Sequence, residues 1–589
     1  MYVRSLSVVL LLALSSVLSA QETSWVERSN RHAEVMMAVR GAFQPEFTSF
    51  FGVSDYDEQV FDLGPRLGER YRAALREARA ELQRRLADER DANVRQDLEI
   101  MIAAAEQEIE GSALGEKYEL PWFPLMQALF IGHRTLLQPQ VAAARRSAAL
   151  VRLRRYTGLA AGSESIFAQA RARFEERMAD ENLLGPVRLE VEQALADQPA
   201  LVAGIRQLYE EFGMAEAGEV LDVFEQQAAE YAAWQREVVL ARARDDFRRP
   251  AELYAFQLKS VGVDIDPRLL MQRAQVNFME TRAAMQALAP VVAEQKGLKV
   301  TDYRDVIRAL KQEQLGTDEI EPYYREQVIP ELERLIAEHG IVELPGRPMI
   351  MRLASAAETA AQPAPHMQPP PLVNNTGQMG QFVLPLGNPG IAGEVDSNYD
   401  DFNYPAVAWT LTAHEGRPGH ELQFTAMVER GVSLARSLFA FNSANVEGWA
   451  LYAEAEMVPY EPLEGQLIAL QFRLMRAARA MLDPMLNLEL ISRAEAERVL
   501  REEVVLSAPM TRQELDRYTF RSPGQATSYF YGYSRILEMR AETELALGER
   551  FDRLEFNNFL LDQGLLPLDL LAEIVRTGFV PAQRAKARP

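Results

Sequence analysis

The chain has 589 residues, 48% of them hydrophobic, and a formal net charge of −22. We expect neither nucleic acid nor an anionic membrane surface as a partner, because phosphate groups are bound by concentrated basic surfaces. The chain contains no cysteine and only six histidines. Disulfide bonds and a lipid-modified N-terminal cysteine are therefore not expected, and a metal site would have to use His, Asp or Glu. The length predicts several domains or one large multi-lobed unit.

Residues 1–20 are typical of a signal peptide. Arg4 provides the positive start, residues 8–18 are apolar, and Ser19 and Ala20 offer small side chains for cleavage before Gln21. A short membrane anchor is the alternative, but a helix needs about 20 apolar residues to span a bilayer. We expect a periplasmic or secreted protein without a stable membrane anchor after signal cleavage.

Residues 21–340 are predicted to be helical. The segment YRAALREARAELQRRLADER at 71–90 places Leu75, Leu82 and Leu86 on one stripe, with Arg and Glu elsewhere. This spacing is typical of an amphipathic surface helix. Similar patterns recur from 161 to 335, and we assign their charged runs to solvated helix faces.

The composition changes in residues 341–404. IVELPGRPMIMRL and GQFVLPLGN are short apolar runs bounded by Gly and Pro, so we predict strands there. The segment AQPAPHMQPPPLVNNTG is too rich in proline for a helix, and is either an interdomain linker or an ordered loop over a cleft. Helical patterning returns in residues 405–589. The prediction is a mainly α protein with a small β element, in which 21–340 and 405–589 form one integrated unit.

The segment AHEGRPGHEL at 413–422 holds two histidines, His414 and His420, with Glu415 directly after the first. On an unbroken helix these histidines would point about 120° apart and could not bind one ion. Gly416, Pro418 and Gly419 lie in this segment, and a break there would let the two side chains converge. A helix-ending turn with two incidental histidines is the alternative.

A further ligand is expected from NVEGWALYAEAEM. Glu447 and Glu454 are seven residues apart and share one face of a helix, whereas Glu456 is expected to face solvent. Acidic side chains in an apolar helix are costly to bury unless they are paired or bind a metal. An ordinary amphipathic helix with its acids facing outward is the alternative.

A third cluster lies in RYTFRSPGQATSYFYGYSRILEMR. It contains several tyrosines and arginines: Tyr518, Tyr529, Tyr531, Tyr533, Arg517, Arg521 and Arg535. A tyrosine hydroxyl can donate to the oxyanion of a tetrahedral intermediate, and an arginine can bind a peptide carboxylate. A tyrosine-rich helix can equally be ordinary core packing.

Together, HEGRPGH, NVEGWALYAE and PGQATSYFYG, followed by FDRLEFNNFLLDQGLLPLDLL, resemble the bacterial domain-of-unknown-function 885 family. The order of these segments also resembles helical gluzincin zinc peptidases such as angiotensin-converting enzyme, thimet oligopeptidase and carboxypeptidase Taq. The likeness implies a large two-lobed helical peptidase fold. The chain departs from these patterns in its longer His-to-His spacing and in Asn557, where the family often has a histidine.

The resemblance also implies roles for individual residues. It makes three residues zinc ligands, namely His414, His420 and Glu447. It makes Glu415 the general base and Tyr529 the donor to the oxyanion. Arg517 lies upstream of Tyr529 at a spacing similar to that of the carboxylate-binding basic residue of the converting enzyme.

These observations favour an exported zinc-dependent metallopeptidase that hydrolyses short peptides. In this hypothesis zinc activates a water molecule, Glu415 accepts its proton, and Tyr529 and the metal stabilise the oxyanion. One alternative is a zinc hydrolase that acts on a non-peptide amide or ester. Another is a metal-free helical binding protein that retains the motif. Metal content separates the last alternative from the first two, and a peptide digest separates those two.

Overall fold

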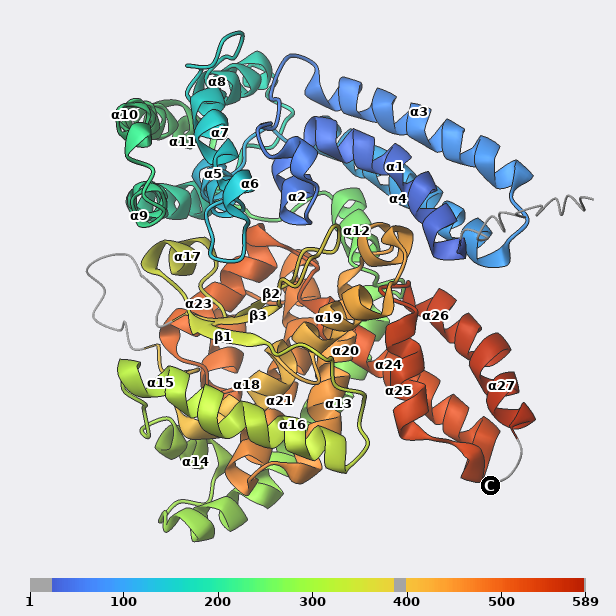
Figure 1. Ribbon diagram of the computed structural model, residues 1–589. Coiled ribbons are helices and arrows are strands. Elements are labelled where there is room, and N and C mark those ends of the chain that lie inside the picture. The colour runs from blue at the N-terminus through green and yellow to red at the C-terminus, as the bar shows by residue number, and fades with distance from the viewer. Residues whose placement is uncertain (1–23, 386–398, 587–589) are drawn as a thin grey trace, which may run out of the picture.

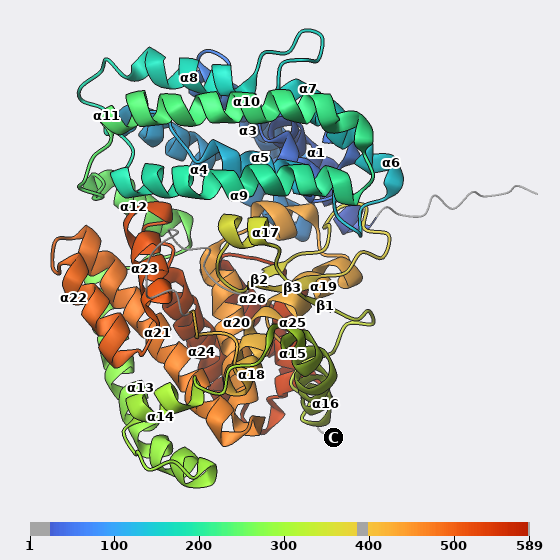
Figure 2. The ribbon, with the colours of Figure 1, turned by 90° about the vertical axis from the view of Figure 1, so that its left-hand side faces the viewer.

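The computed structural model describes residues 24–385 and 399–586, so the predicted signal peptide at 1–20 lies outside the described residues. The described chain is mainly helical with one small sheet, as predicted. Figure 1 shows two layers, with α1–α11 above and α13–α27 below, and the side view in Figure 2 shows the same division. Within the described ranges, no helix is both long and apolar enough to cross a lipid bilayer.

The upper layer contains two groups of helices. The first is α1 (Trp25–Phe43), α2 (Pro45–Phe50), α3 (Leu67–Asp88) and α4 (Ala92–Tyr118). The predicted leucine stripe lies in α3, where Leu75 and Leu82 are buried and Leu86 is half-buried. The second group is α5 (Leu125–Arg134), α6 (Ala143–Arg146), α7 (Ala148–Tyr156), α8 (Ile166–Arg177), α9 (Arg188–Glu211), α10 (Gly218–Trp234) and α11 (Leu240–Arg242).

The lower layer combines helices from both halves of the chain. The helix α12 (Ala251–Ser260) lies between the layers, and it is followed by α13 (Pro267–Lys296), α14 (Tyr303–Leu310), α15 (Thr317–Tyr323) and α16 (Ile329–Glu338). The long helix α13 packs along α21 (Leu463–Asn487), and α16 packs against α18 (Pro405–Glu415). The last third of the 21–340 region is therefore part of the same body as residues 405–586.

The described chain has two large hydrophobic cores, and their boundary does not coincide with the boundary between the two layers. The larger core joins α1, α3 and α4 to the helices of the lower layer. The second core fills the space among α5–α10 and includes residues of α17 (Ala356–Ala361). The first helix group is thus fixed to the lower body, and the second group forms a separately packed unit above it.

A three-stranded sheet lies where the layers meet. Its strands are β1 (Ile350–Leu353), β2 (His366–Gln368) and β3 (Gln381–Leu384), in the order β1-β3-β2. β1 pairs parallel to β3 with Ile350 opposite Gln381, and β2 pairs antiparallel to β3 with His366 opposite Val383. Both predicted strand segments are confirmed, as β1 and β3. The proline-rich segment supplies β2, so its beginning is ordered structure rather than a linker.

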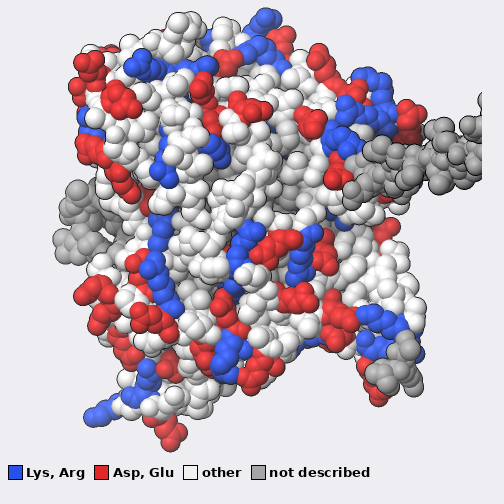
Figure 3. Space-filling model, in the orientation of Figure 1, with Lys and Arg blue, Asp and Glu red and all other residues white. Residues whose placement is uncertain are grey.

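The C-terminal helices complete the lower layer. They are α19 (His420–Arg430), α20 (Ser443–Met457), α22 (Arg493–Arg498), α23 (Ala508–Asp516), α24 (Thr527–Leu547), α25 (Arg553–Asp562), α26 (Leu568–Ile574) and α27 (Val580–Ala585). The helices α18, α19, α20 and α24 contact one another in sequence, with α18 and α24 both against α21. On the face drawn in Figure 3, basic side chains are interspersed with acidic ones.

Candidate metal centre

The two histidines of the 413–422 segment lie on different helices. α18 ends at Glu415 and α19 begins at His420, so the backbone between the histidines leaves α geometry, as predicted. A Cβ on Gly419 would lie 2.0 Å from the carbonyl oxygen of His414. Only glycine permits this approach, which brings the start of α19 against the last turn of α18.

Buried polar contacts fix the loop between these helices. The Arg417–Pro418 peptide bond is cis, and the carbonyl oxygen of Pro418 accepts a hydrogen bond from Trp449 Nε1 at 3.1 Å. The Arg417 side chain contacts Glu421 at 2.7 Å and Glu333 at 2.8 Å. The loop is therefore held by α20, α19 and α16, and the relative positions of α18 and α19 are defined.

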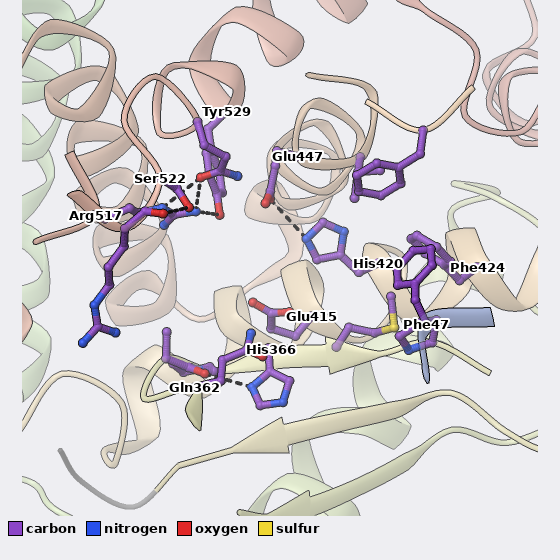
Figure 4. Close-up of a pocket in the computed structure, with 18 of the residues that line it drawn as sticks. Phe47, Gln362, His366, Glu415, His420, Phe424, Glu447, Arg517, Ser522 and Tyr529 are labelled. Carbon is purple, nitrogen blue, oxygen red and sulfur yellow. Dashed lines mark hydrogen bonds and ion pairs between the residues drawn. The ribbon is translucent and has the colours of Figure 1, made fainter. Parts of the chain in front are cut away.

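The break brings three ligand-type side chains together. Nε2 of His414 and Nε2 of His420 lie 3.6 and 3.3 Å from the same carboxylate oxygen, Oε2 of Glu447. Four tetrahedral bonds of about 2.0–2.1 Å to zinc separate their ligand atoms by roughly 3.3 Å, so these distances fit such an ion. No other group of His, Asp or Glu within the described ranges converges in this way. All three side chains are buried or nearly so. Figure 4 shows the Glu447 carboxylate and the His420 ring pointing toward each other.

Glu454 stands behind His414. Its Oε1 lies 2.6 Å from Nδ1 of His414 and 3.3 Å from Arg476, and its Oε2 accepts a hydrogen bond from Thr410 at 3.1 Å. Burial alone would raise the pKa of Glu454, but Arg476 and His414 lower it, so the carboxylate stays ionised. A carboxylate at Nδ1 fixes the ring so that Nε2 faces the centre, as is usual for histidines that bind metals. The sequence placed Glu454 on the face of Glu447 but did not assign it this role.

Close packing of two helices sets Tyr529 opposite the histidines. A Cβ on Gly448 would lie 2.5 Å from the backbone carbon of Gly532, so α20 and α24 approach at these two glycines. Glu447 precedes the first glycine, and Tyr529 lies one turn before the second. The rings of Tyr529 and His414 are nearly parallel, with their centroids 6.3 Å apart.

Arg517 holds the Tyr529 hydroxyl in place. Its Nη2 donates to the hydroxyl oxygen at 2.7 Å and to Oε1 of Gln525 at 2.5 Å, and its guanidinium lies over the Tyr529 ring. Arg479 covers the same ring and forms two hydrogen bonds to Glu514. Burial raises the pKa of Tyr529, so the hydroxyl keeps its proton. Since Arg517 occupies an acceptor site, the O–H is free to donate into the cavity.

These side chains line one cavity of about 660 Å³. It is bounded by His414, Glu415, His420, Glu447, Arg517 and Tyr529, which are all six residues named as site candidates from the sequence. Glu415 lies beside the centre, with Oε1 4.0 Å from Nε2 of His414. Burial, together with the charge of Glu447, raises the pKa of Glu415 to about 7. The arrangement offers a cation site, a proton acceptor and a hydroxyl donor around one space.

Several residues of the cavity wall were not identified from the sequence. His366 of β2 lies beside Glu415 in Figure 4, and its Nδ1 is 3.0 Å from the carbonyl oxygen of Ala364. Burial lowers the pKa of His366 to about 4, so the ring is neutral. The only signal was the possibility that the proline-rich segment covers a cleft. Phe47 comes from α2, far away in the sequence, and nothing in its local pattern indicated the site.

Of the other residues in the sequence motifs, Arg521 also lines the cavity, whereas Tyr518, Tyr531 and Arg535 lie outside its wall. Tyr518 donates to Glu514, and Arg535 donates to the hydroxyl oxygen of the buried Tyr531. The expectation that Glu456 faces solvent is wrong, because it is largely buried in an ion pair with Arg540. Asn557 is buried and accepts a hydrogen bond from Tyr452 at 2.9 Å.

Comparison with known proteins gives the fold and the family. The chain is similar to the crystal structure of "the putative lipoprotein from Colwellia psychrerythraea", with 19% identity, a TM-score of 0.74, and coverage of 95% of this chain and 100% of that one. It is also similar to "a putative lipoprotein of unknown function from Shewanella oneidensis", with 20% identity, a TM-score of 0.68, and coverage of 94% and 100%. No curated protein matches the sequence significantly. Residues 45–575 match the family described as "Bacterial protein of unknown function (DUF885)", and the chain therefore belongs to that family.

Proposed function

We propose that the protein is an exported zinc-dependent metallopeptidase that hydrolyses short peptides. The observation that carries the proposal is the convergence of His414, His420 and Glu447 at the spacing of zinc ligands. Glu415 lies beside this centre, and Tyr529 lies in the same cavity. Two histidines and a glutamate with an adjacent second glutamate are typical of hydrolytic zinc sites.

The side chains divide the chemistry of amide hydrolysis among them. A zinc ion held by His414, His420 and Glu447 would act as a Lewis acid and activate a water molecule. Glu415 is placed to accept a proton from the attacking water and to return it to the departing amine. The Tyr529 hydroxyl is placed to donate to the carbonyl oxygen as negative charge develops there. Arg517 and Arg479 hold the tyrosine ring, so its hydroxyl is positioned before substrate binds.

The position of the cavity supports short peptides as substrates. Its wall combines α1, α2 and α4 of the upper layer with β2, α18–α20 and α24 of the lower layer. A segment has to enter between the layers to reach Glu415, which a folded domain cannot do without unfolding. The order of a His-Glu helix, a glutamate helix and a tyrosine helix also supports a relationship to the gluzincin peptidases.

Export is proposed from two observations. The first 20 residues have the composition of a signal peptide. The two similar solved structures are each described as a "putative lipoprotein", and lipoproteins are exported proteins. This chain contains no cysteine, so a cysteine-linked lipid is not expected.

A metal analysis combined with a peptide digest tests the proposal. The wild-type protein is expected to hold one zinc per chain and to cleave members of a short-peptide library. Glu415→Gln is expected to retain zinc and to lose about 10²–10⁴-fold in kcat. Glu237→Gln, an exposed site in the upper layer, is the matched control and keeps full activity.

Two outcomes would contradict parts of this proposal. A zinc-loaded wild-type protein that cleaves no peptide but hydrolyses other amides or esters would replace the substrate class. A protein that binds no zinc at all would point to the metal-free binding protein instead.

A further inference from the structure

The cavity is chemically different on the two sides of the metal-ligand cluster. Figure 4 shows Arg517, Ser522 and Tyr529 on one side and Phe47 and Phe424 on the other, with Glu415, His420 and Glu447 between them. All of these residues line the same cavity. A molecule that reaches the centre therefore contacts a polar wall in one direction and an aromatic wall in the other.

The aromatic wall is built from distant segments of the chain. Phe47 of α2 and Phe441, just before α20, are 45% and 56% exposed, although they are large and apolar. Buried side chains continue the same surface: Phe424, Leu438, Phe439 and Val446. Exposed aromatic rings inside a cleft are typical of surfaces that a ligand covers.

The arginine beside this aromatic arm, Arg40, is not available to bind an anion. Arg40 forms an ion pair with Glu108 at 3.1 Å. Its guanidinium lies over the rings of Phe439 at 4.5 Å and Phe47 at 5.6 Å. The charge of Arg40 is matched and its faces are covered by rings, so this arm suits an apolar group.

In the polar arm, Arg521 is the cation that is free to bind a ligand. Arg517 is half-buried, and its guanidinium is bound to Gln525 and Tyr529. Arg521 is exposed and forms no ion pair or side-chain hydrogen bond with another described residue. It also lines an adjoining cavity that contains Glu190 and Asp197; both acids lie close enough to interact with its charge, but neither forms an ion pair with it. Arg521 is therefore a better carboxylate ligand than Arg517 in this arrangement.

We propose that the cavity selects peptides with a bulky apolar side chain on the acyl side of the cleaved bond and a free C-terminal carboxylate on the amine side. This inference rests on the proposed peptidase function. The carboxylate binds Arg521, and the apolar side chain lies against Phe47 and Phe441. Hydrolysis adds OH to the acyl carbon and H to the amine nitrogen. The products are a peptide that ends in the apolar residue and a free amino acid or short peptide from the C-terminus.

Peptides that differ in one feature at a time test this inference. N-acetylated tetrapeptides carry Phe, Leu, Gly or Glu at the position before the cleaved bond, each with a free or an amidated C-terminus. We expect kcat/KM to be about 10- to 100-fold higher for Phe than for Gly, since a buried aromatic side chain contributes that much. We expect a free carboxylate to be favoured over an amide about threefold to tenfold. Mass spectrometry of the products identifies the bond that is cleaved.

Variants assign each preference to its arm of the cavity. Phe441→Ala and Phe47→Ala are expected to reduce the preference for Phe and to leave the preference for a free carboxylate unchanged. Phe441→Leu is expected to retain more of the preference for Phe than Phe441→Ala does. Arg521→Ala is expected to remove the carboxylate preference and keep the Phe preference, and Arg521→Lys restores part of it. Leu545→Ala, on the outer surface of α24 and 88% exposed, is the control and changes neither.

Binding measurements separate this inference from the proposed function. The same peptides with a reduced, non-hydrolysable bond after Phe are titrated into the full chain by calorimetry. Binding that follows the predicted preferences without any hydrolysis would support the two arms and contradict the peptidase function. Hydrolysis with equal rates for Phe and Gly, or an unchanged Phe preference in the Phe47→Ala and Phe441→Ala double variant, would overturn the inference and leave the peptidase function standing.

Discussion

Two buried histidines in this protein have opposite surroundings. His133 of α5 lies in the second core, edge-on to the rings of Tyr156, Tyr209 and Phe224 with centroids 5.2, 5.5 and 5.9 Å away. His414 lies at the end of α18 between two carboxylates. Both sit in helices and both are almost fully buried. Their neighbours, rather than their burial, decide what each can do.

The surroundings keep the His133 ring neutral, whereas they fix the orientation of the His414 ring. Burial, with the nearby charge of Arg152, lowers the pKa of His133 to about 3, so its ring is a neutral packing element. Its one described polar contact is with the Tyr209 hydroxyl at 3.0 Å. His414 instead has Glu454 behind it and Glu447 in front, which orients Nε2 toward a shared point. A buried histidine becomes a candidate ligand when carboxylates approach both of its nitrogens.

Removing a ligand from the proposed metal centre gives the largest expected effect. His420→Ala is predicted to reduce zinc from one per chain to near zero and to abolish turnover, because two ligands cannot hold zinc in an open site. The fold should persist, since the core of the lower layer does not depend on this side chain. Metal analysis of the purified variant and far-UV circular dichroism measure both. His32→Ala on α1 is the matched control, and full zinc retention in His420→Ala would contradict the assignment.

A smaller effect is expected from Tyr529→Phe. The change removes the hydroxyl that Arg517 positions, while the ring and its contacts with Arg479 and Arg517 remain. Loss of one oxyanion donor costs about 10²–10³-fold in kcat, with zinc content unchanged. Tyr533→Phe, in the same helix but outside the cavity wall, serves as the control. Equal kcat values for Tyr529→Phe and wild type would remove Tyr529 from the mechanism.

The carboxylate behind His414 tests what distinguishes it from His133. Glu454→Gln keeps the shape but weakens the orientation of the ring, and zinc affinity is predicted to fall about 10- to 100-fold. Competition with a chelator measures the affinity, and urea unfolding of the metal-free protein checks that stability is preserved. Glu456→Gln, which alters the ion pair with Arg540 instead, is the control. A zinc affinity equal to that of wild type would mean that Glu454 is only a structural residue.

The sequence predicted the parts of the site that depend on local chain chemistry. Gly416, Pro418 and Gly419 indicated the break between α18 and α19, and the seven-residue spacing placed Glu447 and Glu454 on one face. The sequence could not predict which residues from distant parts of the chain surround a given side chain. Glu456 has a partner, Arg540, that is 84 residues away.

Contributions from distant segments were missed for the same reason. Phe47 and His366 reach the cavity only because α2 and β2 pack near α19, and no local periodicity contains that information. The strands β1 and β3 were found because short apolar runs are bounded by Gly and Pro, whereas α17 and β2 were hidden in a segment rich in alanine and proline. The integrated unit of 21–340 and 405–589 was expected, but not that it rests on the packing of α13 against α21.

The smallest expected effect on zinc and turnover, namely none, is that of a change at His133, which acts on stability alone. The unfolded state binds a proton at the ordinary pKa of 6.5, whereas folded His133 binds one only near pH 3. The stability that neutral His133 contributes is therefore present above pH 6.5 and is lost as the pH falls toward 3, by up to about 1.4 kcal/mol for each pH unit. His133→Gln removes this titration and should flatten the fall in the urea midpoint between pH 6.5 and 4. Glu46, whose pKa burial raises, is present in both proteins and cancels in the comparison. Zinc content should be the same in both. If the two proteins lose stability in parallel on acidification, His133 is not the buried neutral group, and the contrast with His414 fails.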